Sequence, residues 1–257
     1  MDKSRIKILV VGATGSIGRY VVEEALRDGH GVRVLVRSRG KLSFPSEVEV
    51  IVGDLTQPHT LRAAVDGIGA IVFTHGSHGG ASAAEAIDYG GVRNILAALG
   101  DRRVRIALMT SIGVTDRKGA HDWKRRAERL VRASGLPYTI VRPGWFDYND
   151  ANQLRLVLLQ GDKRQSGTPR DGVIARRQLA EVLVRSLTSQ EALRKTFELV
   201  AETGPAPNDF DRLFGALDAD EAGSVDAVHD ATNMPLDQEP TQVVEELDNA
   251  KVRAFSQ

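Results

Sequence analysis

A strand, a glycine-rich turn and a helix follow one another at the start of this chain, and this order constrains the fold more than any other feature. The β-branched run 6–11 is typical of a buried strand, and from Ser16 onward the apolar residues recur at helical spacing. Three glycines, Gly12, Gly15 and Gly18, lie where the strand turns into the helix. Such a turn offers unpaired backbone N–H groups and the positive end of a helix dipole, which suit a pyrophosphate. The segment therefore predicts a dinucleotide-binding turn.

Each of the three glycines has its own steric role in such a turn. Gly12 permits the tight turn, Gly15 lets the backbone approach the phosphates, and Gly18 lets the helix pack closely against the strand. The alternative is a glycine-rich turn with no ligand, but the strand before it and the helix after it favour a binding site. The residues expected to form this site are Gly12, Ala13, Thr14, Gly15, Ser16, Ile17 and Gly18.

Strands and helices alternate through most of the sequence. The expected strands are 6–11, 32–36, 48–52, 70–73, 105–110, 137–141 and 196–200, and the expected helices begin near Ser16, His59, Ala83, His121 and Arg176. Alternation of this kind predicts βαβ units, and hence a parallel sheet with helices on both faces. Right-handed crossovers then give an α/β, doubly wound Rossmann fold, with its ligand crevice at the carboxyl ends of the strands.

The pattern changes at Gly204. We divide the chain into a dinucleotide-binding domain, residues 1–203, and an acidic helical appendage, residues 204–257, in which apolar patterns around Phe214 and Leu247 predict two helices. The appendage holds three Lys or Arg and twelve Asp or Glu, a net charge of −9, so the remainder carries +9 because both totals are 34. The basic body either steers an anionic dinucleotide toward its cleft or binds the acidic appendage, and the sequence leaves both readings open.

Composition excludes several classes of site. The chain has no cysteine, which excludes disulfides, thiol catalysis and thiolate metal sites. His75 and His78 have no further ligand at a suitable spacing, so no metal site is expected. No apolar run is long enough to span a membrane, and the first residues resemble no secretory signal. We therefore expect a cytoplasmic protein that takes a small-molecule substrate, has no membrane or nucleic-acid partner, and is free to form an oligomer.

Four motifs along the chain resemble those of one family. They are the glycine turn with Ala13-Thr14-Gly15 inside it, Gly53-Asp54-Leu55, Thr110-Ser111-Ile112-Gly113, and Tyr138-Thr139-Ile140-Val141-Arg142-Pro143-Gly144. In this order they resemble the atypical and extended short-chain dehydrogenase/reductases, and among them the NmrA-like, NAD(P)H-binding group. The resemblance covers roughly residues 6 to 200, and it implies a Rossmann fold and a nicotinamide cofactor.

The tip of the second expected strand bears on which dinucleotide binds. An NAD site usually places an acid there, to bind the ribose 2′-hydroxyl. Here the strand ends in Arg37-Ser38-Arg39, and the guanidinium of Arg37 is suited to a 2′-phosphate, so we expect NADP. The alternatives are a solvated basic loop for Arg37 and a cap or turn role for Asp54. By resemblance, the remaining contacts to the cofactor come from Asp54, Leu55, Thr74, His75, Gly76, Pro143, Gly144 and Trp145.

The resemblance also implies a catalytic serine, tyrosine and lysine. Ser111 matches the serine and Lys124 matches the lysine, and both are also expected to contact the cofactor. The tyrosine position is Ala120, so the family's usual proton donor is absent. The candidate substitutes are Tyr148, His121 and Tyr89. We select Tyr148, which follows the segment expected to border the substrate pocket. His121 is expected to turn away as a surface or capping histidine, and Tyr89 to pack in the core.

The basic run after Lys124 is expected to be a solvated helix face at Arg125 and Arg129. Glu128 is expected to pair with Lys124 as an i,i+4 neighbour.

Together these features predict an NADP-dependent oxidoreductase that transfers a hydride to a small carbonyl or quinone-like substrate. A redox sensor that binds NADP without turnover is the alternative, which Ala120 favours. A sugar-nucleotide epimerase fits less well, because the C-terminal part is small and the tyrosine is missing.

Overall fold

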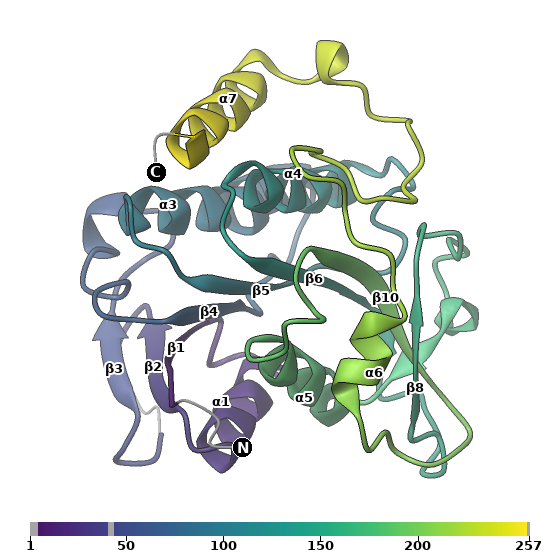
Figure 1. The fold of residues 1–257 in the computed structure, drawn as a ribbon. Helices are drawn as coiled ribbons and strands as arrows, with labels where there is room; N and C mark the ends of the chain where they lie inside the picture. The colour runs from purple at the N-terminus through teal and green to yellow at the C-terminus, as the bar shows by residue number, and fades with distance from the viewer. Residues whose placement is uncertain (1–4, 41–43, 256–257) are drawn as a thin grey trace.

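A computed structural model describes residues 5–40 and 44–255 of the chain. Its centre is a parallel sheet with helices on both faces, so the expected doubly wound α/β fold is confirmed (Figure 1). The seven parallel strands lie in the order β3-β2-β1-β4-β5-β6-β10. They are β1 Lys7–Val11, β2 Gly31–Val36, β3 Glu49–Val52, β4 Ala70–Phe73, β5 Arg105–Met109, β6 Tyr138–Pro143 and β10 Lys195–Glu202.

Three further strands extend the sheet beyond β10. They are β7 Trp145–Phe146, β8 Arg155–Leu159 and β9 Val173–Ile174, of which β8 and β9 run antiparallel to β10. None of these three strands was expected from the sequence. Two of them have only two residues, and strands this short take their form from pairing with neighbours rather than from a local pattern.

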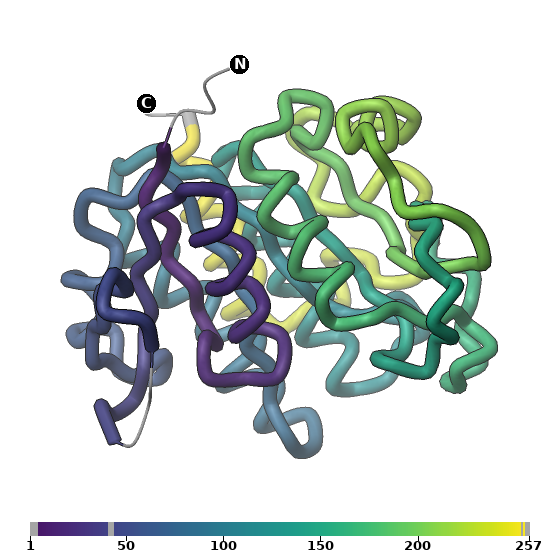
Figure 2. The backbone as a smooth tube through the Cα atoms, turned by 90° about the horizontal axis from the view of Figure 1, so that it is seen from below, coloured from purple at the N-terminus to yellow at the C-terminus, as the bar shows by residue number. Residues whose placement is uncertain are grey.

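Each face of the sheet has its own helices and its own hydrophobic core. Helix α1, Gly18–Arg27, packs against α5, Arg176–Ser186, on one face, and Figure 2 shows them side by side. Helices α3, Gly90–Leu99, and α4, Gly119–Ala133, cover the other face. The core between α1, α5 and the sheet includes Val10, Val34 and Phe197, and the opposite core includes Leu9, Ile71 and Ile140. This alternation along β1 is the pleat of a strand that is buried on both faces.

Two of the expected helices differ from prediction. The helix expected near His59 is only the 3-10 turn Pro58–Thr60. The helix expected near Ala83 begins as α2, Ala81–Ala83, passes through the π-helical turn Ala84–Tyr89 and continues as α3. Such π-turns are frequent at functional sites.

The acidic appendage is divided between the two faces. Helix α6, Phe210–Gly215, packs through Phe214 on the core of α1 and α5, while α7, Thr241–Phe255, packs through Val243 and Leu247 outside α4. Between them, residues 218–239, which we call the acidic strap, pass across α4 (Figure 1). No helix in the described ranges is long and apolar enough to cross a membrane.

The acidic strap binds the basic side chains of α4 and β6. Asp226 accepts from Arg129 at 2.8 Å, Glu239 from Arg126 at 2.7 Å, and Asp230 from Arg142 at 2.7 Å. Of the two readings of the charge asymmetry, the structure therefore shows that the appendage binds the body.

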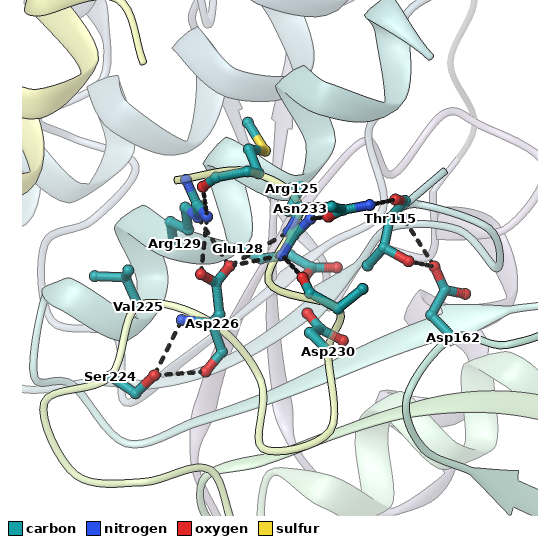
Figure 3. A network of polar contacts seen from close by, with 12 residues as sticks. Thr115, Arg125, Glu128, Arg129, Asp162, Ser224, Val225, Asp226, Asp230 and Asn233 are labelled. Atoms are coloured by element: carbon teal, nitrogen blue, oxygen red, sulfur yellow. Dashed lines mark hydrogen bonds and ion pairs between the residues drawn. The ribbon is translucent and has the colours of Figure 1, made fainter. Parts of the chain in front are cut away.

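These contacts correct two expectations about α4. Arg125 and Arg129 do not form a solvated face, because their side chains are 0% and 1% exposed beneath the strap (Figure 3). Glu128 does not pair with Lys124. Its side chain is fully buried and accepts from Arg142 at 3.0 and 2.7 Å. Arg129 is thus paired with the strap instead of solvent, and Glu128 with Arg142 and its helical neighbour Arg132 instead of Lys124.

Candidate functional site

The glycine turn joins the end of β1 to the start of α1. Gly12 has a φ of +90°, and a Cβ there would lie 2.6 Å from the backbone nitrogen of His75, so only glycine fits. A Cβ on Gly18 would overlap the Gly12 carbonyl oxygen. At Gly15 a Cβ would meet only that same oxygen, at 3.1 Å, and the turn is exposed around it. This open backbone at a helix N-terminus fits a pyrophosphate.

Side chains at the tips of β2 and β3 border the place expected for the adenosine. Hydrogen bonds from the Thr56 backbone N–H and hydroxyl, both 2.8 Å, lower the pKa of Asp54, and the positive charge of Arg37 lowers it further. Asp54 thus has the turn role that we considered as an alternative, and its contact with adenine stays a prediction. Arg37 is exposed.

The segment after β4 approaches the glycine turn through its backbone. Thr74 is buried and donates to the Val11 carbonyl at 3.0 Å. The His75 ring lies against α3, where a Cβ on Gly91 would be 2.9 Å from its Nε2. Burial lowers the pKa of His75 to about 4 despite the attraction of Asp88, so the ring is neutral at pH 7. The backbone of His75 lies next to Gly12 of the glycine turn, and its contact with the cofactor stays a prediction.

A cavity of about 380 Å³ opens at the carboxyl ends of β5 and β6. Five residues singled out from the sequence line it together: Ser111, Lys124, Pro143, Gly144 and Trp145. The Ser111 hydroxyl oxygen is buried and has no hydrogen-bond partner among the described residues. A buried hydroxyl without a partner is costly unless a water molecule or a ligand satisfies it, so this atom is a candidate ligand contact in the cavity.

Lys124 reaches the cavity from α4 and is held by Asp88. Its Nζ donates to one carboxylate oxygen of Asp88, and the other oxygen accepts from the backbone and hydroxyl of Ser77. Ser77 follows Gly76, where a Cβ would be 3.9 Å from Nζ. Asp88 thus ties the lysine to the segment expected to follow the nicotinamide ribose. Sequence reasoning missed Asp88, a single acid in a helix that no pattern distinguishes.

The side chains of Tyr148 and His121 are not placed as the sequence predicted. Tyr148 is 65% exposed, contacts the edge of Trp145, and does not line the cavity. His121 does line it, with Nδ1 2.9 Å from both Asp116 Oδ1 and the Gly113 carbonyl oxygen. The helix starts two residues before His121, so its first turn directs the ring toward the loop after β5 rather than away from it.

Buried polar groups fix the loop that follows Ser111. Asp162 accepts from the backbone N–H groups of Gly113 at 2.6 Å and Thr115 at 2.8 Å. From the opposite side, Asn233 of the acidic strap donates to the Thr115 carbonyl at 2.9 Å (Figure 3). The appendage therefore supports the cavity wall, which the sequence did not reveal. No group of three or more His, Asp or Glu that would hold a metal ion occurs in the described part of the chain.

Comparison with known proteins agrees with this geometry. A family model described as NAD(P)H-binding matches residues 12–190. Sanguinarine reductase of Eschscholzia californica is 29% identical over 84% of this chain and 97% of its own length. A chloroplastic protein of Arabidopsis thaliana, named only as uncharacterised, is 30% identical over 81% of this chain and 74% of its own. A solved structure classed with the NAD-dependent epimerases/dehydratases, from Bacillus halodurans, has a TM-score of 0.68 at 25% identity, over 82% of this chain and 100% of that one.

Proposed function

The chain belongs to the NAD(P)H-binding family, and from that premise we propose that it is an NADP-dependent oxidoreductase of the atypical short-chain class. Its reaction is the transfer of a hydride to a small carbonyl or quinone-like substrate. The observation that carries this proposal is the partnerless Ser111 hydroxyl, which shares one cavity with Lys124 at the strand ends. The relative named a reductase, which aligns over nearly its whole length, supports reduction rather than binding alone.

The protein contributes binding, orientation and polar groups to this reaction. A reduced nicotinamide supplies the hydride when it is bound. The glycine turn binds the pyrophosphate, Arg37 binds the 2′-phosphate, and Lys124 orients the nicotinamide ribose. Ser111 donates a hydrogen bond to the substrate oxygen, on which negative charge develops as the hydride arrives. Each role is satisfied by an atom at the carboxyl edge of the sheet, where such folds bind their ligands.

The walls of the cavity support this substrate class. Trp145, Phe146, Ile112 and Met109 give the lining apolar surface. A volume of about 380 Å³ is at the small end of ligand sites. The cavity therefore suits a compact apolar or aromatic carbonyl compound.

A redox sensor that binds NADP without turnover is the second candidate. It is favoured by Ala120 at the position of the usual tyrosine and by the pairing of Lys124 with Asp88 instead of a phenol. The intact Ser111 is harder to explain in a sensor, because no chemistry then needs its hydroxyl.

A turnover assay separates the two candidates. NADPH oxidation is followed with a panel of small aldehydes, ketones and quinones, and Ser111→Ala is compared with the wild type. Removing one oxyanion donor costs ~10²–10³ in rate, so the variant should lose far more turnover than affinity for NADPH. NADPH binding without oxidation across the panel would refute the enzyme and favour the sensor.

The cytoplasmic location stays a prediction, since the Arabidopsis relative is chloroplastic.

A further inference from the structure

The cavity holds a second pair of titratable side chains, Asp116 and His121, to which the proposed function assigns no role. His121 follows Ala120, the position at which the family's tyrosine is missing, in the first turn of α4. Its Nδ1 is 2.9 Å from Asp116 Oδ1 and 2.9 Å from the Gly113 carbonyl oxygen. Both of these oxygens only accept, so Nδ1 carries a proton and donates it to them.

The other ring nitrogen of His121 is left for a ligand. Nε2 makes no hydrogen bond to any described residue, and the ring forms part of the cavity wall with Ser111 and Lys124. The side chain is 29% exposed, which lets it exchange protons with solvent. Because Nδ1 is committed to its two acceptors, Nε2 is the nitrogen left to pass a proton to a ligand in the cavity.

The surroundings of Asp116 keep its carboxylate charged. Burial raises the pKa of Asp116, but hydrogen bonds from Lys118 and His121 outweigh burial and hold the pKa below its ordinary value. The carboxylate therefore both orients the ring and stabilises an imidazolium, as the acid of a catalytic triad does. The other charged groups around the ring are Lys118 on the same loop, Lys124 one turn along α4, and Asp171 on the cavity wall.

We propose that His121 is the general acid of the reductase, oriented by Asp116, in place of the missing tyrosine. This role rests on the proposed function. As the carbonyl carbon of the substrate receives the hydride, the electron pair of the C=O π bond moves to oxygen. That oxygen takes the proton from Nε2, so an N–H bond breaks and an O–H bond forms. The imidazole is left neutral, with its remaining proton still on Nδ1 and hydrogen-bonded to Asp116, and solvent restores the proton on Nε2. One carbonyl compound, one NADPH and one proton give one alcohol and one NADP⁺.

Turnover measurements test this assignment with His121→Gln, Asp116→Asn and the control His59→Gln, whose exposed side chain lies outside the cavity. His121→Gln should lower kcat by ~10²–10⁴ and leave NADPH affinity within about threefold, since no phosphate or ribose contact is removed. The pH profile of kcat should differ between the wild type and His121→Gln, because the variant lacks the group that donates the proton. Asp116→Asn should lose less, because the Gly113 carbonyl still holds Nδ1. The control should match the wild type.

A spectroscopic measurement is independent of turnover. Nitrogen NMR of the imidazole rings, with His121→Gln used to assign the signals, should show neutral His121 with its proton on Nδ1 and none on Nε2. The opposite tautomer would overturn the proposal whatever the activity. An active wild type that His121→Gln leaves unchanged in rate and pH profile would overturn this role alone. A wild type that binds NADPH but reduces nothing in the panel would overturn the proposed function and this role together.

Discussion

Asp230→Ala tests whether the acidic strap stabilises the fold through buried charge pairs. Asp230 and Arg142 are both 0% exposed in their side chains, and the two carboxylate oxygens each accept one guanidinium N–H at 2.7 Å. A hydrogen bond to a charged group contributes about 1.5–3 kcal/mol, which sets an upper range of about 3–6 kcal/mol for the pair. Glu128 still binds the guanidinium through two bonds after the substitution, so the loss lies near the lower end. We expect the free energy of unfolding to fall by about 3 kcal/mol.

The assay is chemical denaturation at neutral pH, with Glu202→Ala as the matched control. Glu202 also accepts a short bond from an arginine, at 2.6 Å from Arg155, but both side chains are exposed. An exposed pair contributes at most about 1 kcal/mol. If Asp230→Ala costs no more than Glu202→Ala, the strap does not stabilise the protein in this way, and the argument from burial is wrong.

The pH dependence of the same variant gives a second check. Burial raises the pKa of Asp230, but the bonds from Arg142 outweigh it, so the folded pKa lies below the unfolded one. A carboxyl with a lowered folded pKa contributes stability above its unfolded pKa and loses it as the pH falls through the folded value. The difference between wild type and Asp230→Ala should therefore narrow in acid.

Two further predictions concern the cofactor and the pH profile. If Arg37 binds the 2′-phosphate, the wild type should bind NADPH at least ~10-fold more tightly than NADH. Arg37→Ala should remove this preference without weakening the binding of NADH. Equal affinities for the two cofactors in wild-type titrations would contradict the assignment. Burial raises the pKa of Glu198 from its ordinary 4.5 to about 7, although the charge of Arg142 opposes this shift. Between pH 4.5 and about 7 the folded state therefore holds a proton that the unfolded state releases. The free energy of unfolding should decline as the pH rises through this range. Unfolding curves at several pH values should show a flatter profile for Glu198→Gln, and an unchanged slope would contradict the raised pKa.

The parallel strands could be predicted because their signal is local. Strands such as β1 and β4 are buried on both faces, so their sequences are continuous apolar runs bounded by turn residues. Strands β7 and β9 have two residues each and exist through their pairing with neighbours. A two-residue segment has no periodicity, and no reading of the sequence alone separates it from a loop.

The buried charges could not be predicted for a related reason. A run of Lys and Arg on a helix is ordinarily solvated, and nothing within α4 distinguishes Arg129 from an exposed residue. Its partner, Asp226, follows 97 residues later, after the last strand. The only advance signal was the opposite net charge of the two parts of the chain, which indicated that they attract each other but not which residues meet.

The residues of the candidate site also fall into two groups, those that could be predicted from the sequence and those that could not. Ser111 and Lys124 could be named because they match the serine and lysine positions of the family that the sequence resembles. Asp88, Asp116 and Asp162 could not, since each is a single acid whose role depends on the residue that it contacts. Yet these acids place the groups that the proposed reaction uses. Asp88 forms an ion pair with Lys124, and Asp116 is hydrogen-bonded to His121, which lines the same cavity. In the proposed mechanism the loss of the tyrosine does not by itself make the site inert, because His121, oriented by Asp116, donates the proton in its place.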